Sequence, residues 1–154
     1  MEKTESEYRK YIITELKSNI VEGKWTEPMQ VAGKGKDGRV LWLDSEMIPG
    51  AFYVETTWAF PITEDDPPDK YPHTVNQSHT HNYDEILAFF GTNYYDPHDL
   101  GGEIELWLGG EKQTITKSAI VFIPKGLQHC PLIYKKVEKP IFIFSTGPGK
   151  MYAS

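Results

Sequence analysis

After about residue 20, short runs of aromatic and β-branched residues alternate with turn-forming clusters along the whole chain. The runs cover residues 40–43, 51–60, 86–90, 104–108, 113–116, 119–123 and 140–144. Gly109-Gly110 lies between two of these runs and is typical of a two-residue hairpin turn. No helical pattern alternates with the runs, so the sequence predicts an all-β sandwich or barrel and disfavours an α/β sheet.

Residues 4–19 have a different periodicity, which predicts a short N-terminal helix. Its apolar residues at helical spacing are Tyr8, Tyr11, Ile12 and Leu16. We expect this helix to pack on the outside of the β-structure. A length of 154 residues fits one domain, with residues 1–22 as the helical segment and residues 23–154 as the barrel.

Charge and composition narrow the range of partners and compartments. The 16 basic and 22 acidic residues give a formal net charge of -6, which disfavours binding to nucleic acid or to an anionic membrane surface. No apolar run approaches the ~20 residues that a membrane-spanning helix needs. Cys130 is the one cysteine, so an intrachain disulfide is excluded. We expect a cytoplasmic protein, and we expect Cys130 itself to be a buried, inert thiol.

Two of the five histidines, His79 and His81, are separated by one residue. On a strand, residues two apart point to the same face, so the two imidazoles would lie close enough to share an ion. Glu85 follows after three residues, and a short bend can return its carboxylate to the same side. Two imidazoles and a carboxylate are a common ligand set for iron, manganese, nickel or zinc.

A second cluster, residues 123–129, follows the apolar run 119–123. Pro124 and Gly126 indicate a tight turn. His129 then begins the next predicted strand, where the turn can return its side chain to the first cluster.

These two segments resemble the two motifs of the cupin superfamily. The matching residues are His79, His81, Glu85 and Gly91 in the first motif, and Pro124, Gly126 and His129 in the second. The resemblance implies a double-stranded β-helix, or jelly roll, with one divalent metal ion inside it. It assigns the metal ligands as His79, His81, Glu85 and His129.

Such a ligand set leaves two positions open on a six-coordinate ion, where a substrate with adjacent oxygen atoms can bind. We therefore expect a metal-dependent enzyme for a small oxygen-rich molecule, with the dioxygenase, isomerase and lyase classes left open. Iron or manganese is favoured, with nickel or zinc as alternatives. A non-catalytic cupin that binds or senses a small sugar or organic acid remains an alternative, as does a purely structural metal site in a dimer.

Tryptophans are the candidates for substrate contacts. In residues 51–60 the more apolar alternate set is expected to face inward. Its members are Phe52, Val54, Thr56 and Trp58. Trp58 is the first candidate and Trp107 the second, and the loop 92–102 is expected near the barrel mouth. A homodimer is also left open, with Trp25, Trp42 and the N-terminal helix as candidate contacts.

Overall fold

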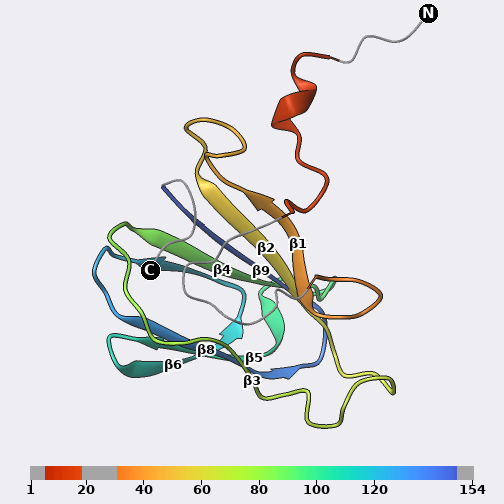
Figure 1. Ribbon diagram of the computed structural model, residues 1–154. Coiled ribbons are helices and arrows are strands. Elements are labelled where there is room, and N and C mark those ends of the chain that lie inside the picture. Colours follow the sequence, from red (N-terminus) through yellow and green to blue (C-terminus); the bar gives the residue numbers. More distant parts are fainter. Residues whose placement is uncertain (1–5, 19–30, 149–154) are drawn as a thin grey trace, which may run out of the picture.

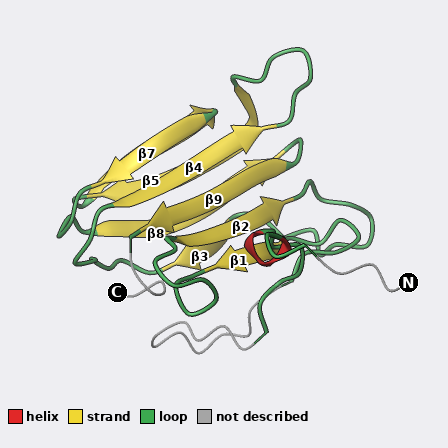
Figure 2. Cartoon of the chain, turned by 90° about the horizontal axis from the view of Figure 1, so that it is seen from above, coloured by secondary structure: helices red, strands yellow, loops and turns green. Residues whose placement is uncertain are grey.

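The fold is held together by pairing between strands that are far apart in the sequence. The structure is a computed structural model, and it describes residues 6–18 and 31–148. Two antiparallel sheets pack face to face (Figures 1 and 2). The strands are β1 (Gly38–Leu43), β2 (Tyr53–Ala59), β3 (His73–Asn76), β4 (Glu85–Gly91), β5 (Asp99–Leu108), β6 (Glu111–Lys117), β7 (Ala119–Ile123), β8 (His129–Val137) and β9 (Ile141–Gly147). The sheet orders are β1-β2-β9-β4-β7 and β3-β8-β5-β6.

The pairs are nested along the chain. β3 pairs with β8, β4 with β7 and β5 with β6, and these successive pairs lie in alternate sheets. A hairpin that is rolled up in this way is the jelly roll. The predicted all-β jelly-roll fold is therefore confirmed.

The core fills the space between the two sheets. Alternate residues of β4, β5 and β9 point into it, since side chains in a strand alternate between its faces. Among the fully buried ones are Phe89, Ile104, Leu106 and Ile141. This alternation fixes which residues of each strand are interior.

The strands agree with the apolar runs of the sequence in most places. The Gly109-Gly110 hairpin is confirmed, because Leu108 and Glu111 pair across it. Two differences remain. β3 lies outside the predicted runs, and β5 begins at Asp99, inside the expected loop 92–102.

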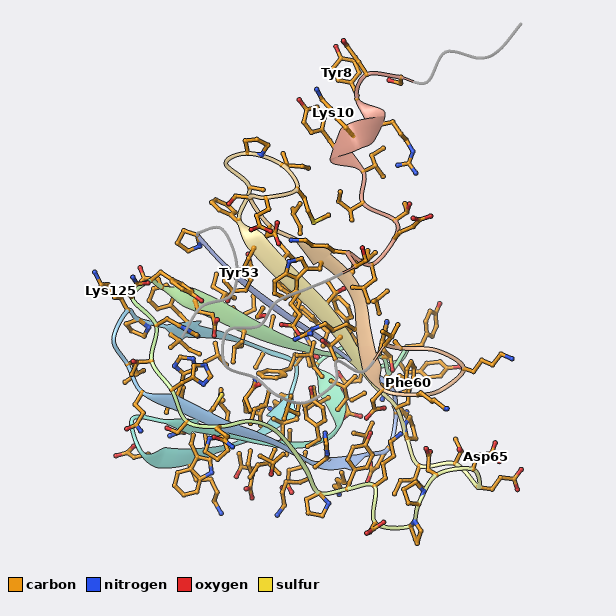
Figure 3. The ribbon with its side chains drawn as sticks, in the orientation of Figure 1. Tyr8, Lys10, Tyr53, Phe60, Asp65 and Lys125 are labelled. Carbon is orange, nitrogen blue, oxygen red and sulfur yellow. The ribbon has the colours of Figure 1, made fainter. Side chains whose placement is uncertain are left out.

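The predicted N-terminal helix is wrong for the residues described. Residues 6–18 contain only a 3-10 turn, Arg9–Tyr11, with no buried residue. Figures 1 and 3 show this segment projecting from the sheets, with Tyr8 and Lys10 far from the core. The boundary expected between residues 22 and 23, and Trp25, lie outside the described residues. In the parts of the chain that the structure describes, no helix has the length and apolar character to cross a membrane.

Candidate metal centre

Two loops meet at one end of the barrel, and backbone hydrogen bonds join them. His79 lies in the β3–β4 loop and forms an isolated antiparallel bridge with His129, the first residue of β8. The two N–H groups each donate to the other residue's carbonyl at 3.0 Å. The Gly126 N–H donates to the His81 carbonyl at 2.9 Å. The turn that contains Gly126 needs a left-handed backbone (φ 82°), which favours glycine.

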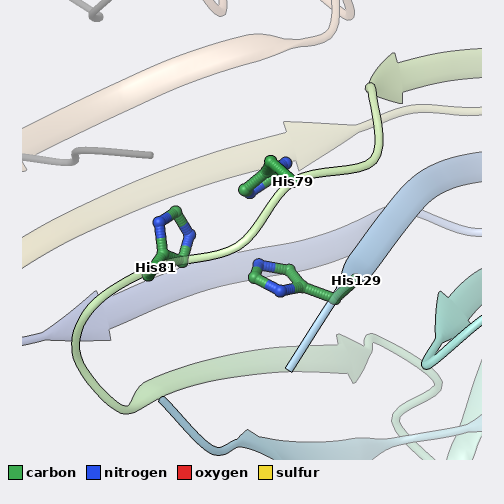
Figure 4. Close-up of side chains that lie close together, drawn as sticks. All are labelled: His79, His81 and His129. Carbon is green, nitrogen blue, oxygen red and sulfur yellow. The ribbon is translucent and has the colours of Figure 1, made fainter. Parts of the chain in front are cut away.

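The three histidines of the predicted ligand set lie together (Figure 4). One ring nitrogen from each of His79, His81 and His129 lies within 4.8 Å of the others. His79 and His81 belong to a loop rather than to a strand, yet their rings still reach the same side, with centroids 4.7 Å apart. His81 and His129 are buried, and His79 is partly exposed.

Backbone carbonyls set the tautomers of two of these rings. His79 Nδ1 lies 2.6 Å from the Gln77 carbonyl, and His129 Nδ1 lies 2.9 Å from the Leu127 carbonyl. A carbonyl only accepts, so each Nδ1 carries the proton, and in the neutral ring Nε2 is then the unprotonated nitrogen, as in metal-ligating histidines. Burial lowers the pKa of His79, which favours the same neutral form.

Glu85, at the start of β4, places its carboxylate against the two buried rings. Its Oε2 lies 3.3 Å from His81 Nε2, and its Oε1 lies 3.5 Å from His129 Nε2. Burial opposes ionisation of this side chain, but contacts with His129, His81 and Tyr53 outweigh it and bring the pKa of Glu85 down to about 2. Glu85 is therefore a carboxylate at neutral pH.

The residues fit a divalent transition ion. Among the described residues, the buried Nε2 of His129 has no hydrogen-bond partner, a costly arrangement unless something else binds that atom. Neutral imidazoles and a carboxylate are the donors that iron, manganese, nickel and zinc accept. The structure thus brings together all four residues that the sequence assigned to the metal.

The two candidate substrate contacts lie elsewhere. Trp58 packs against Phe60 and Phe142, with ring centroids 5.8 and 5.2 Å away, on the outer face of the five-stranded sheet. Trp107 alternates with the fully buried Leu106, so it lies on the outer face of the other sheet. The structure brings neither tryptophan to the histidines.

In residues 51–60, the alternate set that we expected to face the interior faces outward instead. Phe52 is 65% exposed, whereas Tyr53 is fully buried. The sequence argument assumed that the more apolar face points inward, but the outer face of this sheet is also apolar. The loop 92–98 is also misplaced in the prediction, because β4 starts at the metal centre with Glu85 and ends at the far end of the barrel with Gly91.

Tyr53 and Tyr83 are the residues that sequence reasoning missed. The Tyr53 hydroxyl donates a hydrogen bond to Glu85 Oε2. The Tyr83 ring stacks on His81, with centroids 4.7 Å apart and an interplanar angle of 11°. Spacing offered one signal, since Tyr83 continues the alternation of His79 and His81 towards Glu85.

Cys130 is buried beside His129 in the core, as expected for an inert thiol. Burial and then the charge of Glu85 raise its pKa to about 12. The thiolate is the reactive form of cysteine, so this thiol is a poor nucleophile at neutral pH.

No family model and no curated protein matches the sequence. The chain is similar to an RmlC-like cupin from Shewanella frigidimarina, at 13% identity over 80% of this chain and 86% of that one, with a TM-score of 0.45. A cupin protein from Bacteroides fragilis matches at 14% identity over 84% and 91%, with a TM-score of 0.46. KdgF from a Halomonas species matches at 14% identity over 80% and 88%, with a TM-score of 0.44.

The nested pairing of β3 with β8, β4 with β7 and β5 with β6 is that of a jelly roll. The chain therefore has the double-stranded β-helix, or jelly-roll, fold.

Proposed function

We propose that this chain is a metal-dependent enzyme that acts on a small oxygen-rich molecule. The proposed ligands of one divalent transition ion are His79, His81, Glu85 and His129. The observation that carries the proposal is the convergence of three imidazoles, with one ring nitrogen of each within 4.8 Å of the others and with Nδ1 of His79 and His129 hydrogen-bonded to backbone carbonyls. Iron or manganese is the favoured ion, with nickel or zinc as alternatives.

The donor set supports catalysis rather than a purely structural ion. A structural site closes its coordination with protein ligands, whereas four donors leave two positions on a six-coordinate ion. The bound ion would supply Lewis acidity and a template for two substrate oxygens. Adjacent oxygens of a hydroxy-acid, hydroxy-ketone or diol suit such a template. The dioxygenase, isomerase and lyase classes all use this chemistry.

The net charge of the chain and its exposed apolar side chains indicate which kinds of partner it binds. The net charge of -6 supports a small molecule rather than nucleic acid as the ligand. The single cysteine is in keeping with a cytoplasmic protein.

We also propose a homodimer through the outer face of the five-stranded sheet, where Ile120 and Phe122 are 68% and 59% exposed. Trp42, once a candidate for this contact, is only 1% exposed and is a core residue.

The test is the metal content of the full chain, purified without chelator or a metal-binding tag. We expect about one transition ion per chain, and its loss in the double variant His79→Ala, His129→Ala. The matched control is His73→Ala, His98→Ala, which removes the same number of histidines from exposed positions outside the centre. The control should keep its ion.

Two results would contradict the proposal in different ways. A native protein that neither contains nor takes up iron, manganese, nickel or zinc has no metal function. A native protein that holds its ion and binds organic acids or sugars without converting them is the non-catalytic binding cupin.

A further inference from the structure

Ser145, on β9, is a buried polar residue that the metal centre does not explain. Five of the described residues are both buried and polar or charged. Three of them belong to the metal centre, and a fourth, Asp44, accepts hydrogen bonds from two other side chains. Ser145 is the fifth. It is 8% exposed, and its hydroxyl has no hydrogen-bond partner among the described residues. A buried hydroxyl without a partner costs free energy, so a bound group that pairs with it would stabilise the interior.

Tyr134, on β8 of the opposite sheet, carries a second hydroxyl of this kind. The residue is 4% exposed, and no group within residues 6–18 and 31–148 forms a hydrogen bond with its hydroxyl. Burial raises the pKa of this hydroxyl, and the carboxylates of Glu55 and Asp37 raise the pKa further. Both carboxylates therefore lie near the Tyr134 hydroxyl.

Glu55 faces the same interior from β2. It lies on the same side of this strand as the fully buried Tyr53, and it is directly opposite Ser145 in the β2–β9 ladder. Its Oε1 accepts from Arg39 Nε at 2.6 Å. The guanidinium balances the charge of the carboxylate, and both side chains are still partly exposed. Solvent therefore reaches this part of the interior.

The topology explains why the interior is open here. β6 and β7 are edge strands of the two sheets, and a single residue, Ser118, joins them. The other two edge strands, β1 and β3, consequently lie together on the opposite side (Figure 2). Within the described ranges, no ladder of hydrogen bonds joins β1 to β3. Arg39 and Glu55 lie on β1 and β2, beside this open edge.

The polar residues of the interior lie next to the metal centre. Glu55 is two residues along β2 from Tyr53, whose hydroxyl donates to Glu85. Ser145 is opposite Leu87, which is two residues along β4 from Glu85. Two residues of a strand span about 7 Å. One small molecule can therefore contact both the metal centre and these residues.

We propose that Glu55, Tyr134 and Ser145 form a subsite that binds the hydroxyl groups of a polyhydroxylated substrate, such as a sugar or an alditol. This inference rests on the proposed function and deepens it, because it names the substrate class. A ligand hydroxyl both donates and accepts, so it can donate to the carboxylate and also pair with the two protein hydroxyls. An apolar or aromatic ligand would leave all three groups without partners, which is unfavourable.

The test compares two probes on the full chain treated with zinc, and saturation-transfer NMR measures the affinities. Xylitol carries a hydroxyl on every carbon. The second probe, 1,2-pentanediol, has the same carbon chain and the same terminal diol but no further hydroxyl. Both offer a pair of adjacent oxygens, and only xylitol can also satisfy the subsite. We expect the native chain to bind xylitol at least about 10-fold more tightly, since several hydrogen bonds are added.

Two variants remove the hydroxyls of the subsite one at a time. Tyr134→Phe and Ser145→Ala should each lower the preference for xylitol about 5-fold, the usual effect of one hydrogen bond. Both variants should fold with at least native stability, because neither hydroxyl has a partner to lose within the described residues. The matched control is Tyr94→Phe, which removes the hydroxyl of an exposed tyrosine in the loop 92–98. It should keep the native preference, and all three variants should keep the zinc content of the native chain.

Failure of the subsite and failure of the metal function give different results. A native chain that binds neither probe, or binds both equally, overturns the subsite, and so do variants that keep the native preference. A chain that holds no transition ion but prefers xylitol, with the preference lowered in Tyr134→Phe and Ser145→Ala, overturns the metal function and leaves the subsite in place.

Discussion

At the scale of single residues, Asp44 shows how a buried charge is satisfied away from the metal centre. Its Oδ2 accepts from Lys17 Nζ and Trp42 Nε1, each at 2.7 Å, and its Oδ1 accepts from the backbone N–H groups of Glu46 and Met47 at 3.0 and 3.1 Å. This carboxylate therefore ties the N-terminal segment to the turn after β1. Among the hydrogen bonds of Asp44 within residues 6–18 and 31–148, the one from Lys17 joins residues 27 positions apart.

The substitution Asp44→Asn should destabilise the fold by about 2 kcal/mol at pH 7, because hydrogen bonds to a charged group are lost. Burial opposes ionisation, but hydrogen bonds from Lys17, Trp42 and Met47 outweigh it and hold the pKa of Asp44 below its usual 3.8. A lowered folded-state pKa stabilises the protein above the unfolded pKa and ceases to do so as the pH falls through the folded one. The difference between native and variant should therefore shrink below pH 3.8.

Urea denaturation across this pH range measures the difference. Glu46→Gln is the matched control, because Glu46 also contacts Lys17, at 3.0 Å, but its side chain is 57% exposed. An exposed ion pair contributes little, so this variant should stay within about 1 kcal/mol of the native chain. A constant deficit for Asp44→Asn from pH 7 to pH 2 would contradict the ionic explanation.

At the scale of elements, the metal centre depends on how the β3–β4 loop is attached to the turn between β7 and β8. Besides the His79–His129 bridge, the Lys125 N–H donates to Asp84 Oδ1 at 2.8 Å. Asp84 precedes Glu85 directly, so this bond sets where β4 begins.

Asp84→Ala should weaken metal binding by about 10-fold, the lower end of the range for lost outer-shell partners. The reason is that one of the hydrogen bonds that hold the turn against the loop that carries His79 and His81 would be lost. Competition with a chromophoric chelator measures the affinity. Asp96→Ala is the control: Asp96 accepts from the His98 N–H at 3.2 Å in the loop at the far end of the barrel. Equal affinities for the two variants would show that the attachment has no role.

Individual strands differ in how well the sequence predicted them. The metal ligands and most strands were found because their signals are local: a motif with fixed spacing, or an apolar run between turns. β3 was missed because its residues are exposed or only partly buried, so it has no apolar alternation. The start of β5 was missed because Gly101-Gly102 is typical of a turn. In the barrel, Gly102 instead lies so close to β8 that a Cβ would approach the Lys136 carbonyl to 2.4 Å.

Other errors came from tertiary context. The helical spacing of Tyr8, Tyr11 and Ile12 predicts a helix only if a surface covers the apolar side, and all three are more than half exposed here. Tyr53 was placed outside because its alternate set contains Glu55 and Thr57 and is the less apolar one. No property of the sequence alone reveals that Tyr53 donates to Glu85, since that contact joins residues 32 positions apart.

At the scale of the whole molecule, the outer faces of the two sheets differ in chemistry. The outer face of the four-stranded sheet carries ion pairs, with Glu105 lying 3.8 Å from Lys112 and 3.6 Å from Lys135. The outer face of the five-stranded sheet carries aromatic and aliphatic side chains. They are Trp58, Phe90, Ile120, Phe122, Phe142 and Phe144. Large apolar patches on soluble proteins mark interaction surfaces, and a second copy offers the same apolar chemistry in return.

The homodimer can be tested by charging this face. Ile120→Lys with Phe122→Lys places two like charges on β7, at the edge of the patch, where both native side chains are exposed and contribute little to the core. We expect the native chain to sediment as a dimer at micromolar concentration and the variant as a monomer, because two like charges have no partner when they are buried in an interface of about 1,600 Å². Thr114→Glu, exposed on β6 of the other sheet, is the control and should remain dimeric.

A native chain that stays monomeric at tens of micromolar, or a charged variant that remains a dimer, would show that this face is not the interface. The metal content of the monomeric variant then separates the two proposals, because all four proposed ligands come from one chain and should bind the ion without a partner.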